Sequence, residues 1–293
     1  MRRTHGLCTY TQAHTHTHAH KTRRTNQATV PSDRVTSKIY DLDGFKNLPA
    51  DFELPPTKSF PKRAEDLPTD FDARTAWPSC PSIRRIRDQC GCGSCFAFGA
   101  IEAFEDRICI HSGRNVTLST GDIVACHVDN NMSCQGGNPI AVWHNIFYGK
   151  KEGDGAIQES CYPYPVKPCP CNHHSVNSSL PHCPPESENT DPLCDAMAKN
   201  QCADQGVFRS TEPTLISDFN MEEEIVTNGP ITAAFTVYDD FLTYSGGIYQ
   251  HGEDAKALGG HAIRIVGYGV EDGHKYWTVA NSWVRRDRAL HSR

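Results

Sequence analysis

The sequence predicts an α+β protein that is rich in disulfide bonds. Three observations support this fold class: one amphipathic helix in the first half, β-type segments in the second half, and 14 cysteines among 293 residues. With 38% hydrophobic residues, the chain can bury one large or two small cores. No apolar run approaches the roughly 18 residues that a membrane-spanning helix needs.

The predicted helix begins after Ser94, which is a suitable N-cap residue, and ends near Gly113. Its apolar stripe consists of Ala97, Ile101, Phe104 and Ile108. This reading places Cys95 in the first helical turn.

The second half of the chain favours β structure. Apolar residues that alternate or are β-branched fill Pro230–Tyr238, His261–Gly269 and Lys275–Trp283, between Gly-rich turns. The stretch Cys161–Cys202 holds six cysteines and many prolines, so cross-links must order it.

Cysteine usage indicates an oxidising, secretory environment. Sequons for N-glycosylation at Asn115, Asn131 and Asn177 agree with it. The alternative is a zinc protein, but paired ligand motifs are missing apart from the fragment Cys92–Cys95. We therefore expect no metal site.

Charge divides the chain into a basic start and an acidic body. Residues 1–66 carry a net charge of +4 and the remainder −10, which argues against nucleic acid as a partner. Residues 1–30 contain a run with His14, His16, His18 and His20 but no apolar period, so we expect a disordered tail. This tail lacks a signal-peptide pattern, although disulfide bonds require translocation.

Cys95 has the setting of a nucleophile. The thiolate is the reactive form, and a helix N-terminus or a neighbouring imidazolium lowers a cysteine pKa from about 8.5 to roughly 3.5–7.5. The sequence Cys92-Gly93-Ser94-Cys95-Phe96 fits the signature C-G-[SA]-C-[WY] of a cysteine nucleophile except at its last position.

A base and its orienting residue follow downstream, in the segments Gly259-Gly260-His261-Ala262 and Ala280-Asn281-Ser282-Trp283. They lie 166 and 186 residues after Cys95, beyond the roughly 130–150 that the signature expects, and the insertion Cys161–Cys202 accounts for the excess. Taken singly, Cys95 could be half of a disulfide, His261 a core histidine and Asn281 a turn residue.

From Leu67 to Trp283 the chain resembles cathepsin B, a branch of the papain-like cysteine peptidases. The matching stretches are Leu67-Pro68, Phe71-Asp72-Ala73-Arg74, Trp77-Pro78, Cys80-Pro81, Asp106-Arg107-Ile108-Cys109-Ile110, Asn228-Gly229-Pro230, Asp240-Phe241 and Tyr249-Gln250-His251. The resemblance implies two lobes around a cleft, with the Cys95 helix in one and His261 and Asn281 on the β-rich other. Residues 67–293 would be the catalytic domain and 31–66 the remnant of a propeptide.

The resemblance also assigns roles in the cleft. The Gln89 amide and the backbone N–H of Cys95 would form the oxyanion hole. Asn281 would orient the His261 imidazole, and Trp283 would shield that hydrogen bond from water. Gly136 and Gly137 match the family's contact to the substrate backbone.

A second motif narrows the expected activity. The stretch from Cys171 to Cys183 contains His173 and His174 and resembles the occluding loop of cathepsin B, whose histidines bind the C-terminal carboxylate of a substrate. This implies release of C-terminal dipeptides beside endopeptidase activity. Asp88 stands where the family has the partner of the first histidine, whereas Leu180 and Arg286 do not reproduce the second anchoring pair.

The resemblance pairs ten cysteines: Cys80–Cys109, Cys92–Cys134, Cys126–Cys194, Cys161–Cys202 and Cys171–Cys183. Cys8, Cys90, Cys95 and Cys169 remain, and Cys90 stands where the family has glycine. Cys90 and Cys169 either form an extra bridge at the base of the loop or stay two separate thiols.

Three departures from the family pattern stand out. Phe96 replaces a Trp or Tyr, and Asn138 replaces an aromatic residue of the specificity pocket. After Trp283, the family's closing strands have no counterpart in the sequence 284–293.

The sequence thus predicts a cathepsin B-like peptidase of the lysosome or extracellular space, made as a zymogen. We expect a monomer without cofactor that acts on peptides and proteins, binds cystatin-like inhibitors, and contacts neither nucleic acid nor membrane. The alternatives are a truncated, non-catalytic chain that binds peptides or inhibitors at most, and a zinc or disulfide binding module.

Overall fold

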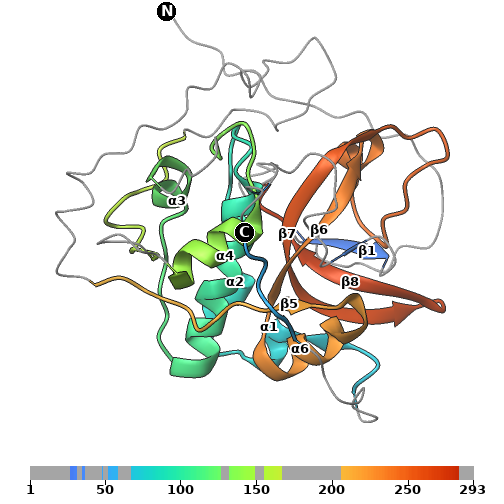
Figure 1. The fold of residues 1–293 in the computed structure, drawn as a ribbon. Helices are drawn as coiled ribbons and strands as arrows, with labels where there is room; N and C mark the ends of the chain where they lie inside the picture. Colours follow the sequence, from blue (N-terminus) through green and yellow to red (C-terminus); the bar gives the residue numbers. More distant parts are fainter. Residues whose placement is uncertain are drawn as a thin grey trace, which may run out of the picture.

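The computed structural model describes residues 27–31, 35–36, 48, 52–58, 67–126, 132–148, 155–166 and 206–283. Within these ranges the chain forms a helical lobe beside a β-rich lobe (Figure 1). None of the described helices combines the length and the apolar character that crossing a membrane would require.

One six-stranded sheet builds the β-rich lobe. Its strand order is β1-β8-β7-β6-β2, with β4 also paired to β7, and each of these pairs is antiparallel. The strands are β1 (Gln27–Pro31), β2 (Val35–Thr36), β4 (Phe71–Asp72), β6 (Ile231–Tyr238), β7 (Ala257–Glu271) and β8 (His274–Ala280). The long strand β7 pairs with β6 over residues 257–265 and with β8 over residues 264–271, with a register shift between Ile265 and Gly267 on the β8 side. Gly267 and Tyr268 of β7 also pair with β4.

The helical lobe is organised around α2 (Cys95–Ser112), which packs with α3 (Thr120–Cys126) and α4 (Pro139–Tyr148). A buried apolar cluster that includes Phe96, Ile101 and Phe104 fills this lobe. A second cluster, with Phe235, Ile263 and Trp277, lies in the sheet lobe. Two separate cores are what the two-lobed expectation requires.

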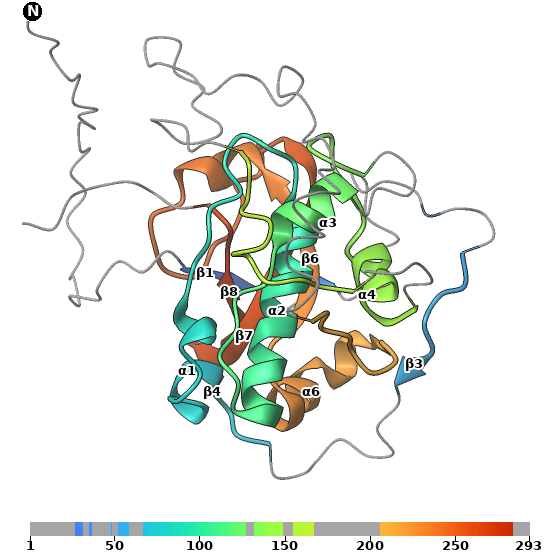
Figure 2. The ribbon, with the colours of Figure 1, turned by 90° about the vertical axis from the view of Figure 1, so that its left-hand side faces the viewer.

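The two lobes meet where α2 crosses β7 (Figure 2). A Cβ atom on Gly99 would lie 3.2 Å from the carbonyl oxygen of Ile263, so this glycine lets the helix approach the strand closely. Deeper in the interface, the fully buried guanidinium of Arg264 on β7 binds Asp106 of α2 at 2.6 Å and donates to the carbonyl of Arg85. The helix and the sheet are therefore fixed to each other by backbone contact and by a buried ion pair.

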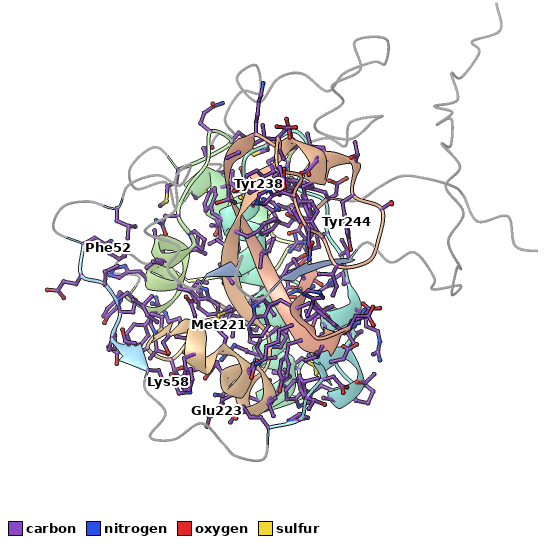
Figure 3. The ribbon with its side chains drawn as sticks, turned by 90° about the vertical axis from the view of Figure 1, so that its right-hand side faces the viewer. Phe52, Lys58, Met221, Glu223, Tyr238 and Tyr244 are labelled. Carbon is purple, nitrogen blue, oxygen red and sulfur yellow. A yellow bond between two sulfur atoms is a disulfide. The ribbon has the colours of Figure 1, made fainter. Side chains whose placement is uncertain are left out.

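Smaller elements complete the described fold. They are α1 (Ala73–Ala76), the 3₁₀ helices Pro81–Arg84, Asp218–Asn220 and Asp239–Thr243, α6 (Met221–Asn228), and a parallel pair of β3 (Thr57–Lys58) with β5 (Leu215–Ile216). Lys58 of β3 lies beside α6 (Figure 3) and binds Glu224 at 2.8 Å.

The predicted helix and the three predicted strands are confirmed with small shifts at their ends. Gly113 ends α2 in the left-handed conformation, as its position predicted. The last strand stops at Ala280, before the Trp283 predicted.

The expected disordered tail 1–30 is wrong for its last four residues, because residues 27–31 form β1 on the edge of β8. Backbone pairing with an exposed edge needs no apolar period, so the pattern did not reveal this strand. The assignment of 31–66 to a propeptide stays a prediction.

Candidate active site

Cys95 is the first residue of α2 and is partly exposed. Gly99 lies one turn further along the same helix face, and it is the residue that touches Ile263. That contact is made with the backbone of Ile263, which follows His261 by two positions on β7. The contact between α2 and β7 thus brings Cys95 and His261 to one interface.

His261 is held in a fixed orientation by Asn281. Its Nε2 atom lies 2.8 Å from Oδ1 of Asn281, and both residues are buried. An amide oxygen is an acceptor, so Nε2 carries the proton and Nδ1 of the neutral ring is left as an acceptor. The indole of Trp283 covers the imidazole, with ring centroids 4.5 Å apart. This is the tautomer that a general base for a thiol needs.

Gln89 is buried, and its side-chain amide is bound at both ends. Its Nε2 donates to the carbonyl of Cys92 at 2.9 Å, and its Oε1 accepts from Ser282 Oγ at 2.5 Å. Its backbone N–H donates to the carbonyl of Ser282 at 2.9 Å. An amide nitrogen has two hydrogens, so one remains for an oxyanion beside Cys95.

Tyr164 joins the Gln89 segment to the start of α2. Its hydroxyl donates to the carbonyl of Gln89 at 2.7 Å and lies 2.7 Å from Oγ of Ser94. Burial raises the pKa of this tyrosine above its usual value. Sequence reasoning missed both Tyr164 and Ser282, because their partners lie far along the chain and neither carries a motif of its own.

The Gly136-Gly137 segment is fastened to the loop that precedes Cys95. The Cys92–Cys134 disulfide and the bond from the Gly93 N–H to the Cys134 carbonyl at 2.8 Å connect the two loops. A Cβ on Gly137 would lie 2.7 Å from the ring of Phe96, which leaves no room for a side chain there. Gly136 adopts a φ of 99°, in the region that favours glycine.

Asp88 stabilises an unusual backbone conformation. Its Oδ1 accepts from the Cys90 N–H at 2.9 Å, and Cys90 has a φ of 56°, where glycine is favoured. A glycine, which the resemblance implied at position 90, would adopt this conformation without strain. Cys90 is buried, and Cys169 lies outside the described residues, so an extra bridge between them stays one of the two predicted alternatives. The proposed partner of Asp88, His173, lies outside the described residues.

The structure describes some of the remaining predicted cysteines and loop residues, but not all of them. Cys80–Cys109 and Cys92–Cys134 are bonded as expected, and Cys92 is therefore not a zinc ligand. Cys126 and Cys161 are disulfide-bonded, with partners outside the described residues. Also outside them are His174, Leu180, Arg286 and the cysteines at 8, 169, 171, 183, 194 and 202.

Asn138, where the resemblance implied an aromatic residue, caps a helix in the structure. Its Oδ1 accepts from the Ile140 N–H at 3.0 Å, in the first turn of α4. The side chain is buried, because it turns inward to cap the helix.

Comparisons with known proteins agree with this geometry. The family model described as papain family cysteine protease matches residues 67–287. The chain is 41% identical over 231 residues to cathepsin B-like cysteine proteinase 6 of Caenorhabditis elegans, covering 74% of this chain and 59% of that protein. It is 38% identical over 249 residues to cathepsin B of Dictyostelium discoideum, covering 84% and 75%.

Among solved structures, procathepsin B S9 from Trypanosoma congolense is similar, with a TM-score of 0.59 and 29% identity. The match covers 83% of this chain and 76% of that one. The chain therefore belongs to the papain family of cysteine proteases, with relatives and a structural neighbour of the cathepsin B type.

Proposed function

We propose that this chain is a cysteine-type peptidase that uses Cys95 as nucleophile and His261 as general base. The observation that carries the proposal is the bond between His261 and Asn281 beneath Trp283, at the interface that also holds the Cys95 turn. A thiol beside an imidazole that is held in one orientation is the arrangement that nucleophilic acyl transfer requires.

The mechanism follows from the donors and acceptors present. Nδ1 of His261 takes the Cys95 proton while the sulfur attacks the peptide carbonyl carbon. The oxyanion receives hydrogen bonds from the Cys95 N–H and the remaining Nε2–H of Gln89. The imidazolium then protonates the leaving amine, and a thioester forms. A water molecule that His261 deprotonates hydrolyses this thioester and restores the thiol.

Two variants test the proposal. Cys95→Ala and His261→Ala should each abolish hydrolysis of a fluorogenic peptide, because nucleophile and base act as one unit. His251→Ala, which removes a histidine stacked on Tyr238, is the control and should keep the wild-type rate. A peptide with an electrophilic end group should label the wild-type chain and not Cys95→Ala. Turnover by a homogeneous Cys95→Ala preparation, or no labelling of the wild type, would contradict the proposal; the second result would favour the non-catalytic alternative.

We further propose that the enzyme releases C-terminal dipeptides in addition to cleaving internal bonds. The support is the sequence Cys171…Cys183 with His173 and His174, together with Asp88 at the start of the oxyanion segment. Asp88 stands where the resemblance implies the partner of His173.

His173→Ala tests this specificity. It should slow dipeptide release while leaving internal cleavage unchanged or faster, because the carboxylate contact is lost and the cleft is less obstructed. His182→Ala, in the same Cys171–Cys183 stretch, is the matched control. Equal loss of both activities in His173→Ala would argue against a gating loop.

The remaining expectations extend the same proposal. Substrates would be peptides and proteins, and cystatin-like inhibitors would compete for the cleft of a monomeric enzyme. The lysosome or the extracellular space would be its compartment, in keeping with the disulfide bonds. The compartment can be tested by expressing the full-length protein with a tag and locating it in cells by immunostaining.

A further inference from the structure

The loop between β6 and β7 contacts the rings that surround the His261 imidazole. Trp283, whose ring centroid lies 4.5 Å from that of the imidazole, has Phe241 of this loop at 5.9 Å. Phe235 of β6, whose ring lies 5.9 Å from the imidazole, contacts the same phenyl ring at 5.2 Å. Two aromatic side chains that contact the imidazole therefore share Phe241 as a neighbour.

Phe241 is buried against two tyrosines of the same loop. The chain leaves β6 at Tyr238 and passes through Tyr244, and both are labelled in Figure 3. The ring of Tyr249 meets Phe241 edge to face, with centroids 4.7 Å apart, and Tyr244 stacks on Phe241 at 5.6 Å. Phe241 is 4% exposed and Tyr249 is 8% exposed. The position of Phe241 therefore depends on how the loop holds Tyr249.

The carboxylate of Asp240 holds Tyr249 in place. Its Oδ1 accepts a hydrogen bond of 2.5 Å from the Tyr249 hydroxyl, and its Oδ2 accepts one of 2.7 Å from the backbone N–H of Gly252. Hydrogen bonds to a charged acceptor are stronger than those between neutral groups. Because Asp240 directly precedes Phe241, the bond to Tyr249 fixes the two rings relative to each other.

A second buried tyrosine provides a comparison within the same sheet lobe. The hydroxyl of Tyr268 on β7 donates to the carbonyl of Pro68 at 3.0 Å, and its ring packs against Phe71 and Trp277. Tyr268 is 5% exposed and follows His261 by seven residues on the strand, a separation of roughly 20 Å. Loss of its hydroxyl should affect stability in a similar way without reaching the imidazole.

We propose that the hydrogen bond from Tyr249 to Asp240 is a positioning device for His261. The bond holds Tyr249 against Phe241, Phe241 keeps Trp283 over the imidazole, and the covered Nε2–H of His261 is kept from water. This inference rests on the proposed peptidase function, because it concerns the general base of that reaction. Tyr249 acts only through other side chains and is a positioning residue.

The Nε2 proton of His261 reports this shielding independently of activity. In a proton NMR spectrum of the full chain, its resonance is identified by its absence in His261→Ala. We expect Tyr249→Phe to accelerate its exchange with water by about fivefold to tenfold, as for the loss of about one hydrogen bond. Tyr268→Phe should leave the exchange rate at the wild-type value. Equal exchange in wild type and Tyr249→Phe, or equal acceleration in both tyrosine variants, would overturn the proposal.

Asp240→Ala tests whether the effect passes through this one bond. The variant removes the acceptor of Tyr249 and of Gly252, so the His261 proton should exchange at least as fast as in Tyr249→Phe. Adding Tyr249→Phe to Asp240→Ala should then cause no further change, because the hydroxyl has already lost its partner. Fully additive effects of the two substitutions would contradict the proposal.

Steady-state kinetics with a fluorogenic peptide separates the positioning role from the peptidase function. Tyr249→Phe should lower kcat and leave KM nearly unchanged, because a less firmly held base affects mainly the chemical step. Tyr268→Phe should keep the wild-type kcat. An unchanged kcat in Tyr249→Phe would overturn the proposal. Faster exchange of the His261 proton in Tyr249→Phe, with a wild-type chain that hydrolyses no peptide, would support the positioning role and contradict the peptidase function alone.

Discussion

Ser282 holds the amide of Gln89 through a hydrogen bond of 2.5 Å from Oγ to Oε1. Ser282 follows Asn281 directly, so one short segment at the end of β8 orients both the imidazole and the amide. The Gln89 amide and the His261 imidazole, which come from different lobes, are thereby set relative to each other.

Removing this hydroxyl should affect the chemical step more than binding. We expect Ser282→Ala to lower kcat about tenfold and to leave KM nearly unchanged, because a misoriented amide loses contact mainly with the transition state. Ser112→Ala, which removes an exposed hydroxyl bound to the carbonyl of Ile108, is the control. Steady-state kinetics with one fluorogenic peptide measures both constants, and an unchanged kcat in Ser282→Ala would refute the role of this bond.

Tyr164→Phe tests the junction between Gln89 and Ser94. The variant leaves the buried carbonyl of Gln89 without its donor, which should lower the free energy of unfolding by about 1–3 kcal/mol. Tyr148→Phe removes an exposed hydroxyl bound to Glu212 and should change it by less than about 0.5 kcal/mol. Urea unfolding measures both. Equal effects of the two variants would show that the buried hydroxyl has no special importance.

Gly137→Ala tests the contact between the Gly136-Gly137 segment and Phe96. The added methyl would meet the ring at 2.7 Å, so we expect a loss of about 1–3 kcal/mol in stability. Gly252→Ala is the matched control, since a Cβ there would have only the Asp240 carboxylate near it, at 3.7 Å. The double variant with Phe96→Leu should recover part of the loss. Thermal unfolding that is unchanged in Gly137→Ala would contradict the close packing.

Glu105 gives the fold a dependence on pH. Burial raises the pKa of Glu105 from 4.5 to about 7, although Arg85 and Arg87 lower it in part. Between these two values the folded state binds more protons than the unfolded state, so the contribution of Glu105 to stability is greatest below about pH 4.5 and is lost as the pH rises towards 7. Glu105 by itself thereby favours the folded state at acidic pH relative to neutral pH.

Glu105→Gln should flatten this dependence. Urea unfolding across that range measures the slope of the unfolding free energy against pH. The variant also loses its ion pairs with Arg85 and Arg87, so its absolute stability falls and only the slope is compared. Glu53→Gln, at an exposed position, controls for the removal of one carboxylate. An equal slope in wild type and Glu105→Gln would contradict the raised pKa.

Features with a local signal could be predicted from the sequence. The stripe ending at Gly113 located α2, and the motif around Cys95 led to His261 and Asn281, which the structure places in contact. Ser282 and Tyr164 could not be found in this way, since their hydrogen bonds span 193 and 75 residues. A hydroxyl that bonds at long range leaves no pattern in the surrounding sequence.

Strand β1 was missed for a different physical reason. Its residues Gln27–Pro31 alternate only at Ala28 and Val30, which is too short a pattern to predict a strand, and the run before them is polar. The strand exists because β8 offers an unpaired edge, a property of the assembled sheet rather than of the segment. A strand that forms by pairing with an exposed edge cannot be predicted from its own sequence, because it depends on the partner strand.

The burial of the Cys80–Cys109 and Cys92–Cys134 disulfides has a consequence for how the protein would tolerate a reductant. Cys80, Cys109, Cys92 and Cys134 are each at most 3% exposed, whereas Cys95 is partly accessible. Thiol exchange requires that the attacking thiolate reach a sulfur atom. A small thiol can therefore rescue an oxidised Cys95 quickly, while the cross-links at both ends of the helix survive. This difference in reaction rate would let the protein keep Cys95 reduced while its buried disulfides stay oxidised.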